Sequence, residues 1–388
     1  MNYTLITDEN ALTALCQRAA RAKAVAIDTE FVRTRTLTPQ LGLLQLYDGE
    51  QLALIDPLAI DDMTSFVALM ENENVVKVLH SCSEDLETFL TAFNCIPSPI
   101  FDTQVAASVL GLGPTLGYAK LVEMLCDKIL DKGESRTDWL ARPLRDAQLH
   151  YAANDVLYLL PAYTVLEARI NQIDKYHWVT EEIVGLAEKK RAQIPPEFAY
   201  LQLKNTWRLN VEQLTVFRHL AAWRLTVARQ KNIALNFVVR ESQLFDIAFK
   251  LPGSRNALSN VGLPPQTFRR YSDTLLALVQ EARALFEDTP PHLRLTRIKR
   301  LIDFPQYKKT MSAVKAVCSL VAQQQGVGED VIASKKQINQ VLKWQWFDND
   351  EYRVQGLFPD LVSGWRAPLL KEQIENIVGT IEPAENHQ

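Results

Sequence analysis

The sequence has few cysteines and no long apolar run, which argues against a disulfide-bonded, zinc-binding or membrane-spanning protein. Its 388 residues include five cysteines, and no two of them are spaced as C-x-x-C. The sequence therefore indicates neither a disulfide framework nor a zinc site, and we expect reduced thiols in a cytoplasmic protein. The longest apolar stretch, near residues 156–166, is interrupted by Pro161 and is too short to span a bilayer. Residues 1–8 lack the pattern of a secretory signal, so we expect no membrane partner.

Length and charge indicate several domains with different partners. A chain of 388 residues suffices for about two or three domains of the usual size. The formal net charge of −4 conceals an asymmetry, because residues 1–192 carry 17 Lys and Arg against 27 Asp and Glu, whereas residues 193–388 carry 25 against 19. An acidic first half suits cation binding, and a basic second half suits a polyanion.

The stretch Ala24–Phe31, which reads AVAIDTEF, predicts a strand with two acids on one face. Side chains alternate along a strand, so Asp28 and Glu30 project side by side. Two neighbouring carboxylates repel each other and resist desolvation unless a cation compensates them, and a divalent metal is the simplest compensation. A pair of acids at a water-facing sheet edge satisfies the same short pattern, so further residues must decide.

The rest of the first half predicts a mixed sheet covered by helices. Residues 41–47 and 51–55 flank the turn signal Asp48-Gly49 and predict an antiparallel hairpin beside the first strand. After residue 62 strands and helices alternate. The patterns predict helices over 7–22, 62–70, 83–93, 104–110, 116–126 and one long helix through 149–160, strands over 75–80 and 100–103, and an irregular segment over 133–143.

Three further polar residues occupy positions from which they could join the acidic pair. Asp85 lies at the start of the helix that follows the strand 75–80, and Tyr151 and Asp155 lie one turn apart at the margin of a helix. A lone Asp at a helix margin is more often simply solvated. Four carboxylates can hold two magnesium-sized cations, which clamp the attacking and leaving oxygens of a phosphodiester when they sit about 3.5 to 4 Å apart.

Two other acids of the first half have simpler interpretations. Asp56 follows a strand and precedes Pro57, which is typical of a turn residue. Asp102 precedes a predicted helix, which is typical of a helix cap.

The second half is helical and repeats itself. The pairs Pro195-Pro196 and Pro290-Pro291 precede the two units and are interpreted as linkers. One ungapped shift of 94 residues aligns the units, which predicts a tandem duplication. The aligned pairs include Gln243 with Gln337, Gly262 with Gly356, Leu263 with Leu357, and Pro265 with Pro359. The first unit is the more basic, although a solvated helix face would explain its charges equally well.

Motifs spread along the chain together resemble a known family. They are Asp28-Thr29-Glu30-Phe31, Asp85 and Tyr151-Ala152-Ala153-Asn154-Asp155, with the further stretches Phe31–Thr36, Pro39–Gly42 and Glu134–Leu144. These residues resemble the ribonuclease D family, in the tyrosine subclass of the DEDD exonucleases. The stretch Asn236–Glu241 resembles the helicase-and-RNase-D C-terminal (HRDC) domain, and the second unit matches that domain more weakly.

The resemblance implies an α/β RNase H-like exonuclease domain over residues 1–192, followed by two all-α HRDC domains over 206–286 and 293–381. It implies a 3′-to-5′ exoribonuclease that trims the 3′ ends of tRNA precursors and other RNAs and releases nucleoside 5′-monophosphates. It further implies two divalent cations, Mg²⁺ or Mn²⁺. Their ligands would be Asp28, Glu30, Asp85 and Asp155.

The resemblance also assigns roles to these residues. Asp28 looks like the ligand shared by both ions, Glu30 and Asp155 look like ligands of the ion on the nucleophile side, and Asp85 looks like the support of the other ion. Tyr151 is similar to the residue that orients the attacking water. A tyrosine hydroxyl with a pKa near 10 is protonated at neutral pH, so we favour a positioning role over that of a general base.

We expect the protein to be a monomer, and two alternatives to the exoribonuclease stay open at this point. A nucleic-acid-binding adaptor that uses the exonuclease fold as a scaffold would bind RNA and cut nothing in Mg²⁺ or Mn²⁺. An exonuclease that acts on DNA would carry the same acidic residues, because contacts to the 2′-hydroxyl cannot be seen in one sequence.

Overall fold

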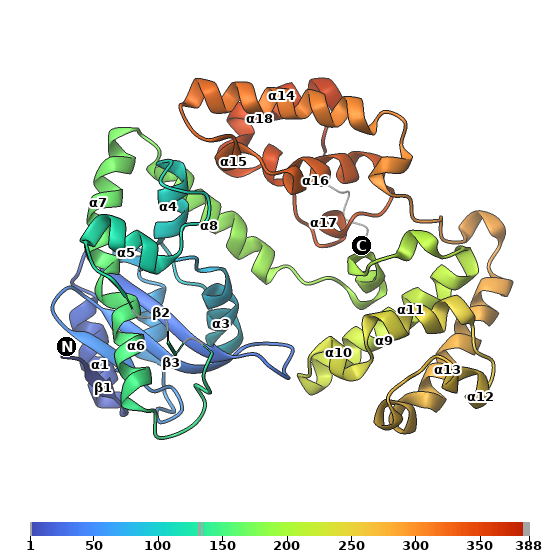
Figure 1. Cartoon of the computed structure of the whole chain (residues 1–388), viewed down its shortest axis with the longest axis horizontal. Coiled ribbons are helices and arrows are strands. Elements are labelled where there is room, and N and C mark those ends of the chain that lie inside the picture. The colour runs from blue at the N-terminus through green and yellow to red at the C-terminus, as the bar shows by residue number, and fades with distance from the viewer. Residues whose placement is uncertain (1, 131–132, 135, 383–388) are drawn as a thin grey trace.

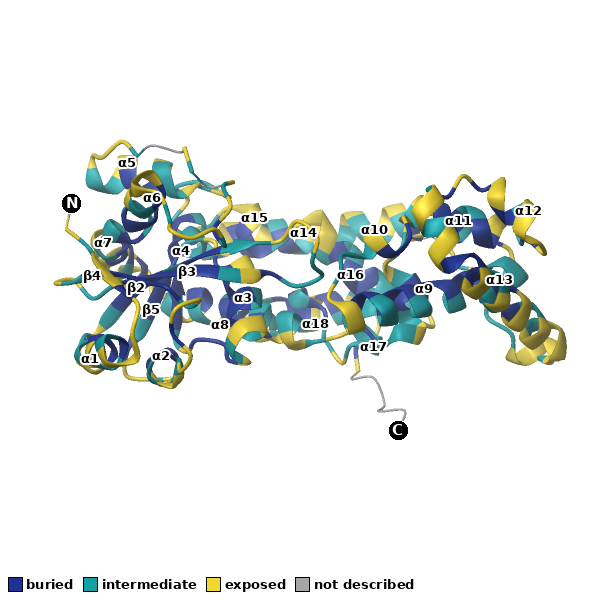
Figure 2. Ribbon diagram, turned by 90° about the horizontal axis from the view of Figure 1, so that it is seen from below, coloured by how far each residue is buried: buried dark blue, intermediate teal, exposed yellow. Residues whose placement is uncertain are grey.

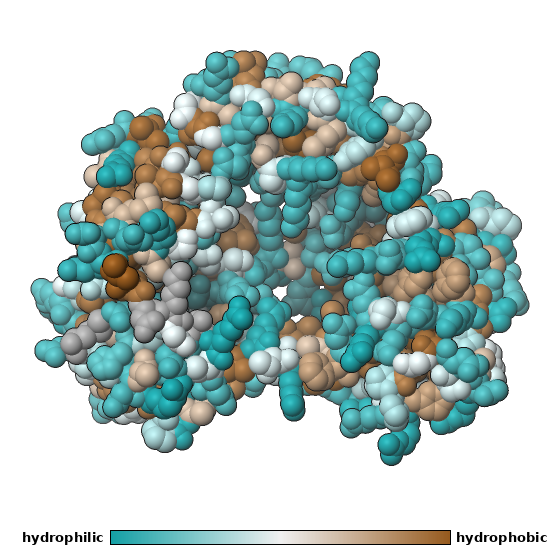
Figure 3. Space-filling view, in the orientation of Figure 1, coloured by the Kyte–Doolittle hydropathy of each residue, from teal (hydrophilic) through white to brown (hydrophobic). Residues whose placement is uncertain are grey.

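The computed structural model describes residues 2–130, 133–134 and 136–382 of the chain, so Met1 of the expected first domain and Ser135 of the quoted motif lie outside the described residues. An α/β part at the N-terminus is followed by two helical units, and the three surround a hollow whose rim is mainly hydrophilic (Figures 1 and 3). Within the described ranges, no helix has both the length and the apolar character needed to cross a bilayer.

A six-stranded mixed sheet forms the centre of the N-terminal part, as predicted. Its strands are β1 (Thr4–Ile6), β2 (Ala24–Val32), β3 (Gln40–Tyr47), β4 (Leu52–Ile55), β5 (Val76–Leu79) and β6 (Ile100–Asp102), and their order is β1-β4-β3-β2-β5-β6. The predicted hairpin is confirmed, because β3 is antiparallel to β2 and to β4. β1 was not predicted, since a strand of three residues is too short for its alternation to be recognised.

Helices cover both faces of this sheet. They are α1 (Glu9–Ala19), α2 (Thr64–Met70), α3 (Ser83–Phe93), α4 (Thr103–Val109), α5 (Tyr118–Cys126), α6 (Asp146–Leu157), α7 (Leu159–Gln172) and α8 (Tyr176–Arg191). The prediction of one long helix through residues 149–160 is wrong, because the helix is divided at Tyr158, whose φ of −100° and ψ of 0° are not helical. Pro161 explains the break, since it has no N–H to donate to the carbonyl of Leu157, four residues earlier.

Small side chains between β2 and α6 determine where the helix lies. Val25 and Ile27 point toward the core that contains α1, α2 and α3, whereas Ala26 points toward the opposite core. Ala152 and Ala153 of α6 belong to the same core as Ala26, and all three are fully buried. Because alanines allow a close approach, α6 lies directly over β2 and β3 (Figure 1).

The two helical units repeat the same order of elements. The first contains η1 (Pro196–Gln202), η2 (Thr206–Arg208), α9 (Val211–Lys231), α10 (Leu235–Val238), α11 (Glu241–Lys250), α12 (Arg255–Ser259) and α13 (Pro265–Asp288). The second contains η3 (Pro291–Leu293), η4 (Leu301–Asp303), α14 (Tyr307–Gln325), α15 (Glu329–Ile332), α16 (Lys335–Trp346), α17 (Glu351–Val354), η5 (Asp360–Val362), η6 (Gly364–Arg366) and α18 (Ala367–Val378).

The bounds of these elements confirm the repeat found in the sequence. A shift of 94 residues carries both ends of α10 onto those of α15 and the start of α11 onto that of α16. The units differ at the long helix α13, which is replaced by η5, η6 and α18. Gly364, with a φ of +50°, and Pro368 fall where α13 has Arg270 and Thr274, so this part of the second unit cannot form one continuous helix.

The two units are attached to the N-terminal part in different ways. The second unit shares one hydrophobic core with it, in which Trp178 of α8 stacks on Trp365 with ring centroids 4.1 Å apart. The first unit has a core of its own (Figure 2). It meets the loop between β2 and β3, where Oδ1 of Asn232 accepts hydrogen bonds from the N–H and the hydroxyl of Thr38 at 3.1 Å each.

Candidate active site

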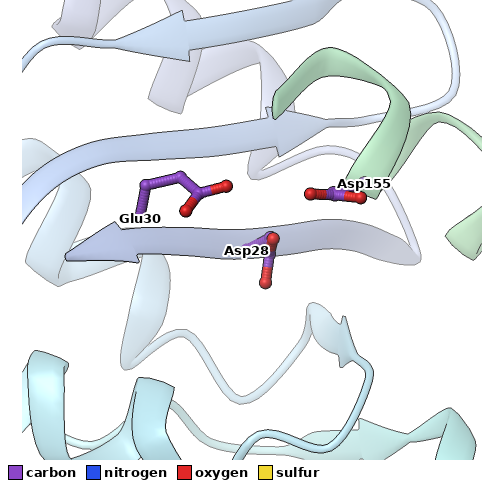
Figure 4. Close-up of side chains that lie close together, drawn as sticks. All are labelled: Asp28, Glu30 and Asp155. Carbon is purple, nitrogen blue, oxygen red and sulfur yellow. The ribbon is translucent and has the colours of Figure 1, made fainter. Parts of the chain in front are cut away.

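Three of the predicted carboxylates meet between β2 and α6. Asp28 and Glu30 project from β2 and Asp155 from α6 (Figure 4), and one oxygen atom of each lies within 4.8 Å of the other two. Glu30 is buried, with 8% of its surface exposed, and the other two are partly exposed. A site with this many oxygen ligands and one open side suits a hard divalent cation.

The fourth carboxylate, Asp85, approaches the cluster from the first turn of α3. Its Oδ1 accepts a hydrogen bond of 2.6 Å from the hydroxyl of Thr29, and only 7% of Asp85 is exposed. Asp85 is not one of the three residues whose oxygens lie within 4.8 Å of one another. Its charge nevertheless acts on the cluster, since burial and then the charge of Asp85 raise the pKa of Asp28 well above its usual value.

Burial and mutual repulsion disturb every carboxylate of the group. Burial, followed by the charge of Asp155, raises the pKa of Glu30 to about 9. Burial raises the pKa of Asp155 to about 7 and that of Asp85 to about 6. No ion pair between described residues involves any of the four acids. Without a cation the cluster therefore retains protons, and divalent ions would supply the missing positive charge.

Tyr151 lies one turn before Asp155 on α6 and is half-buried. A hydrogen bond from its hydroxyl lowers the pKa of Asp155 against the effect of burial. Burial and the charge of Asp155 in turn raise the pKa of Tyr151, so the phenol is protonated at neutral pH. The predicted tyrosine is thus next to the acidic cluster and carries a proton.

Comparison with known proteins agrees with this geometry. Family profiles match residues 3–171 as a 3′-5′ exonuclease, 213–279 as an HRDC domain and 305–374 as the C-terminal HRDC domain of ribonuclease D. Ribonuclease D of Serratia proteamaculans is 43% identical over 381 residues, which cover 97% of this chain and 99% of that protein. Ribonuclease D of Escherichia coli K12 is 42% identical over 378 residues, which cover 97% of this chain and 99% of that protein. The chain belongs to the ribonuclease D family.

Solved structures show the same relationship. The crystal structure of Escherichia coli RNase D, described as an exoribonuclease involved in structured RNA processing, superposes with a TM-score of 0.90 at 41% identity and covers 97% of this chain and 98% of that one. The catalytic core of RRP6 from Trypanosoma brucei superposes with a TM-score of 0.61 at 25% identity. The superposition covers 74% of this chain and 81% of that one. As a member of the ribonuclease D family, the chain is a 3′-5′ exoribonuclease, and exonucleases of this kind depend on divalent metal.

An irregular segment supports Tyr151 in this ribonuclease D fold. Trp139 packs against the tyrosine with ring centroids 6.3 Å apart, and its backbone passes so close to β3 that a Cβ at Gly42 would lie 2.5 Å from the Trp139 carbonyl oxygen. Arg142 fastens the segment, because its Nε and Nη2 donate to the two carboxylate oxygens of Asp56 at 2.7 Å each. The described residues of the segment predicted as irregular are therefore held in place.

Asp102 and Asp56 have the structural roles predicted for them from the sequence. Asp102 caps α4 by accepting from the N–H groups of Gln104 and Val105. Asp56 accepts from the N–H of Leu58 in a turn. Its second partner, Arg142, was missed, since 86 residues separate the two in the sequence.

Two further residues near the cluster were also missed. In the sequence motif Thr29 is only the residue between two acids, yet in the structure its hydroxyl donates to Asp85. Tyr118 donates to the carbonyl of Asn154 at 2.9 Å, and burial and then the charge of Asp155 raise its pKa. The alternation of β2 places Thr29 on the face opposite its acidic neighbours, but no sequence pattern indicates that Tyr118 approaches α6.

Proposed function

We propose that this chain trims the 3′ ends of structured RNAs, tRNA precursors among them, and releases nucleoside 5′-monophosphates. The observation that carries the proposal is the convergence of Asp28, Glu30 and Asp155 within 4.8 Å of one another, with Asp85 held beside them. The Escherichia coli relative, which is described as acting in structured RNA processing, supports RNA as the substrate.

We further propose that the four carboxylates hold two divalent cations, Mg²⁺ or Mn²⁺. When bound, such a pair activates a water molecule and neutralises the charge that develops on the leaving oxygen of the phosphodiester. Asp28 is the natural shared ligand, because its pKa responds to the charges of Asp85, Asp155 and Glu30 alike. Glu30 and Asp155 then serve the side of the attacking water, and Asp85 serves the side of the leaving group.

Tyr151 positions the attacking water in this proposal. Its hydroxyl lies at the Asp155 carboxylate and is protonated at neutral pH, so it can hold the water by a hydrogen bond but cannot accept its proton. The water loses its proton to solvent or to a neighbouring carboxylate.

We propose that the remaining residues recognise the RNA. In this organisation residues 1–192 form the exonuclease domain, and residues 206–286 and 293–381 form two HRDC domains that contact RNA phosphates. The excess of Lys and Arg in the second half of the chain supports phosphate binding. We propose that the protein acts as a monomer in the cytoplasm.

Product analysis of a 5′-labelled tRNA precursor tests the proposal. The chain should shorten the RNA from its 3′ end in Mg²⁺ or Mn²⁺ and leave it intact in EDTA. Asp28→Asn should bind the RNA without digesting it, and Tyr151→Phe should lower the turnover number with little change in affinity. Full digestion by Asp28→Asn would refute the assignment of the site, and equal digestion of a matched DNA would refute the preference for RNA.

A further inference from the structure

A groove beside the connection between the two helical units shares no lining residue with the active site. It has a volume of about 230 Å³ and lies between residues 294–300, here called the linker segment, and the end of α16. We call it the linker groove. Its charged lining residues are Arg297, Lys299 and Asp348, and its aromatic ones are Tyr200, Phe304, Trp346 and Phe347.

The linker segment is basic, and part of its charge is uncompensated. Four Lys and Arg residues, and no acid, lie between Asp288 and Asp303. Arg300 pairs with Asp303 at 2.7 Å. Arg297 and Lys299 are exposed, and neither is within ion-pair distance of a carboxylate in the described part of the chain. The hydrogen bond from Arg300, and to a smaller extent the charge of Arg297, lower the pKa of Asp303. Two such cations close together on one segment suit successive phosphates of a polyanion.

The positions of these cations are fixed by the protein. Leu295 and Ile298 pack against the core of the first helical unit, and Arg297 donates from Nε and Nη2 to the carbonyl of Trp207 at 3.4 and 3.3 Å. Thr296, Arg297 and Lys299, which alternate with or follow these anchoring residues, are exposed. The segment is therefore anchored on one side and open on the other.

The opposite wall of the linker groove is aromatic. The ring centroid of Phe304 lies 5.3 Å from that of Trp346 and 5.8 Å from that of Phe347, and all three rings are partly exposed. Nζ of Lys299 lies 5.6 Å from the centroid of the Phe304 ring. Aromatic faces beside a cationic segment are the arrangement on which successive nucleobases stack while their phosphates are neutralised.

We propose that the linker groove binds a single-stranded segment of RNA. Phosphates would contact Arg297 and Lys299, and bases would stack on the Phe304–Trp346 pair. A duplex hides the faces of its bases, so the rings favour a single strand. The choice of RNA rests on the proposed function, in which RNA is the substrate. Asp348, the carboxylate among the lining residues, can balance only one of the two positive charges of Arg297 and Lys299. An acidic peptide would match the cations but would leave the rings unused.

Charge reversal tests the phosphate contacts. The affinity for a 5′-fluorescein-labelled, unstructured RNA of about 20 nucleotides is measured by fluorescence anisotropy over a range of salt concentrations, in EDTA so that no RNA is degraded. For the double variant Arg297→Glu with Lys299→Glu, we expect the Kd to rise at least about tenfold. The slope of log K against log salt should become shallower by about 1.4, because two phosphates of a single strand are no longer neutralised.

A matched double variant controls for charge alone. Arg169→Glu with Lys315→Glu makes the same change of charge at exposed positions that do not line the groove. We expect its Kd to stay within about twofold of the unchanged chain. Equal affinities and equal salt slopes for the two double variants would overturn the proposal.

Substitution at Trp346 tests the stacking separately. Trp346→Ala should raise the Kd about fivefold or more, whereas Trp346→Phe keeps an aromatic face and should stay within about twofold. Circular dichroism melting of each variant shows that it is folded at the temperature of the assay. Equal loss of affinity in both Trp346 variants would contradict stacking.

Two further measurements separate this proposal from its alternatives. If polyglutamate competes with RNA for the unchanged chain as strongly as unlabelled RNA does, the groove belongs to an acidic protein partner and the proposal fails. Digestion of a five-nucleotide RNA in Mg²⁺ should be the same for the unchanged chain and the groove variants. If no chain digests RNA but the groove variants still lose affinity in EDTA, the proposed function fails and the groove assignment stands.

Discussion

The hydroxyl of Thr29 donates a hydrogen bond of 2.6 Å to Oδ1 of Asp85 and so joins β2 to α3 at the acidic cluster. Thr29 lies between Asp28 and Glu30 in the sequence and is itself buried. The bond fixes Asp85 relative to both of these carboxylates. It also opposes the effect of burial on the pKa of Asp85, which nevertheless reaches about 6.

Removal of this hydroxyl should weaken metal binding. Thr29→Val keeps the shape of the side chain but leaves Asp85 without its donor, so the pKa of Asp85 should rise and its carboxylate should turn more freely. Loss of a group that orients a metal ligand typically costs about 10- to 100-fold in metal affinity or activity. We expect the Mg²⁺ concentration for half-maximal RNA digestion to rise by at least about tenfold. Thr29→Ser should restore it, and an unchanged Mg²⁺ titration of Thr29→Val would contradict this role.

Much of the candidate site follows from local sequence patterns. Alternation in β2 predicts that Asp28 and Glu30 share a face, and helical spacing predicts that Tyr151 and Asp155 lie one turn apart. In the structure β2 and α6 contribute to one core, and the acidic residues of both elements meet beside it.

Other features depend on contacts between distant segments, which local patterns do not contain. Neither spacing nor composition indicates that Trp139 passes against Gly42, or that Trp178 stacks on Trp365. Pairing of the short strand β1 with β4 likewise depends on a neighbour nearly 50 residues away. Local periodicity therefore predicts the elements and their faces, and tertiary packing decides which faces meet.

Neutralising one carboxylate should stabilise the metal-free chain while abolishing activity. Glu30 is buried, and its pKa is raised first by burial and then by the charge of Asp155. Glu30→Gln removes that charge at little change of volume. In EDTA at pH 9 we expect the free energy of unfolding to rise by about 1 to 2 kcal/mol, an effect of ordinary size for one substitution. Urea unfolding measures the change.

The control for this variant is Glu50→Gln, an exposed glutamate in a turn. It should change the free energy of unfolding by less than about 0.5 kcal/mol. A decrease in the stability of Glu30→Gln would show that Glu30 has an unrecognised cationic partner when no metal is present.

The metal-free chain should lose stability as the pH rises. The folded pKa values of Asp85, Asp155 and Glu30 are raised to about 6, 7 and 9, above those of the unfolded chain. The folded state thus binds more protons than the unfolded state, and its stabilisation is complete below about pH 4 and is lost as the pH passes through these values. Urea unfolding in EDTA at pH 5, 7 and 9 measures the free energy of unfolding, to which the cluster should contribute less at each higher pH.

Saturating Mg²⁺ should reverse this trend. Ions bind the deprotonated carboxylates, so the stabilisation that they give should grow with pH over the same range. The difference between the unfolding free energies with and without Mg²⁺ isolates the cluster from all other titrating groups. A difference that is constant from pH 5 to pH 9 would contradict the assignment of these carboxylates as ligands.

Gly42 should be required for the placement of Tyr151. A methyl group at this position would lie 2.5 Å from the carbonyl oxygen of Trp139, and backbone cannot rotate away as a side chain can. Gly42→Ala must therefore displace the segment that carries Trp139, which packs against Tyr151. Overpacking of this kind typically costs about 1 to 3 kcal/mol. We expect a lower melting temperature and a lower turnover number, with the Mg²⁺ concentration for half-maximal activity unchanged.

Gly185→Ala is the matched control, because Gly185 lies within α8 and a Cβ there would meet no atom within 4 Å. Alanine is the better helix former, so this variant should be as stable as the unchanged chain or slightly more stable. The contrast separates the steric effect at Gly42 from the general effect of a glycine replacement. If the Trp139 segment positions Tyr151, its displacement must move the tyrosine hydroxyl and change the turnover number. A Gly42→Ala variant with lower stability but an unchanged turnover number would therefore show that the segment stabilises the fold without positioning Tyr151.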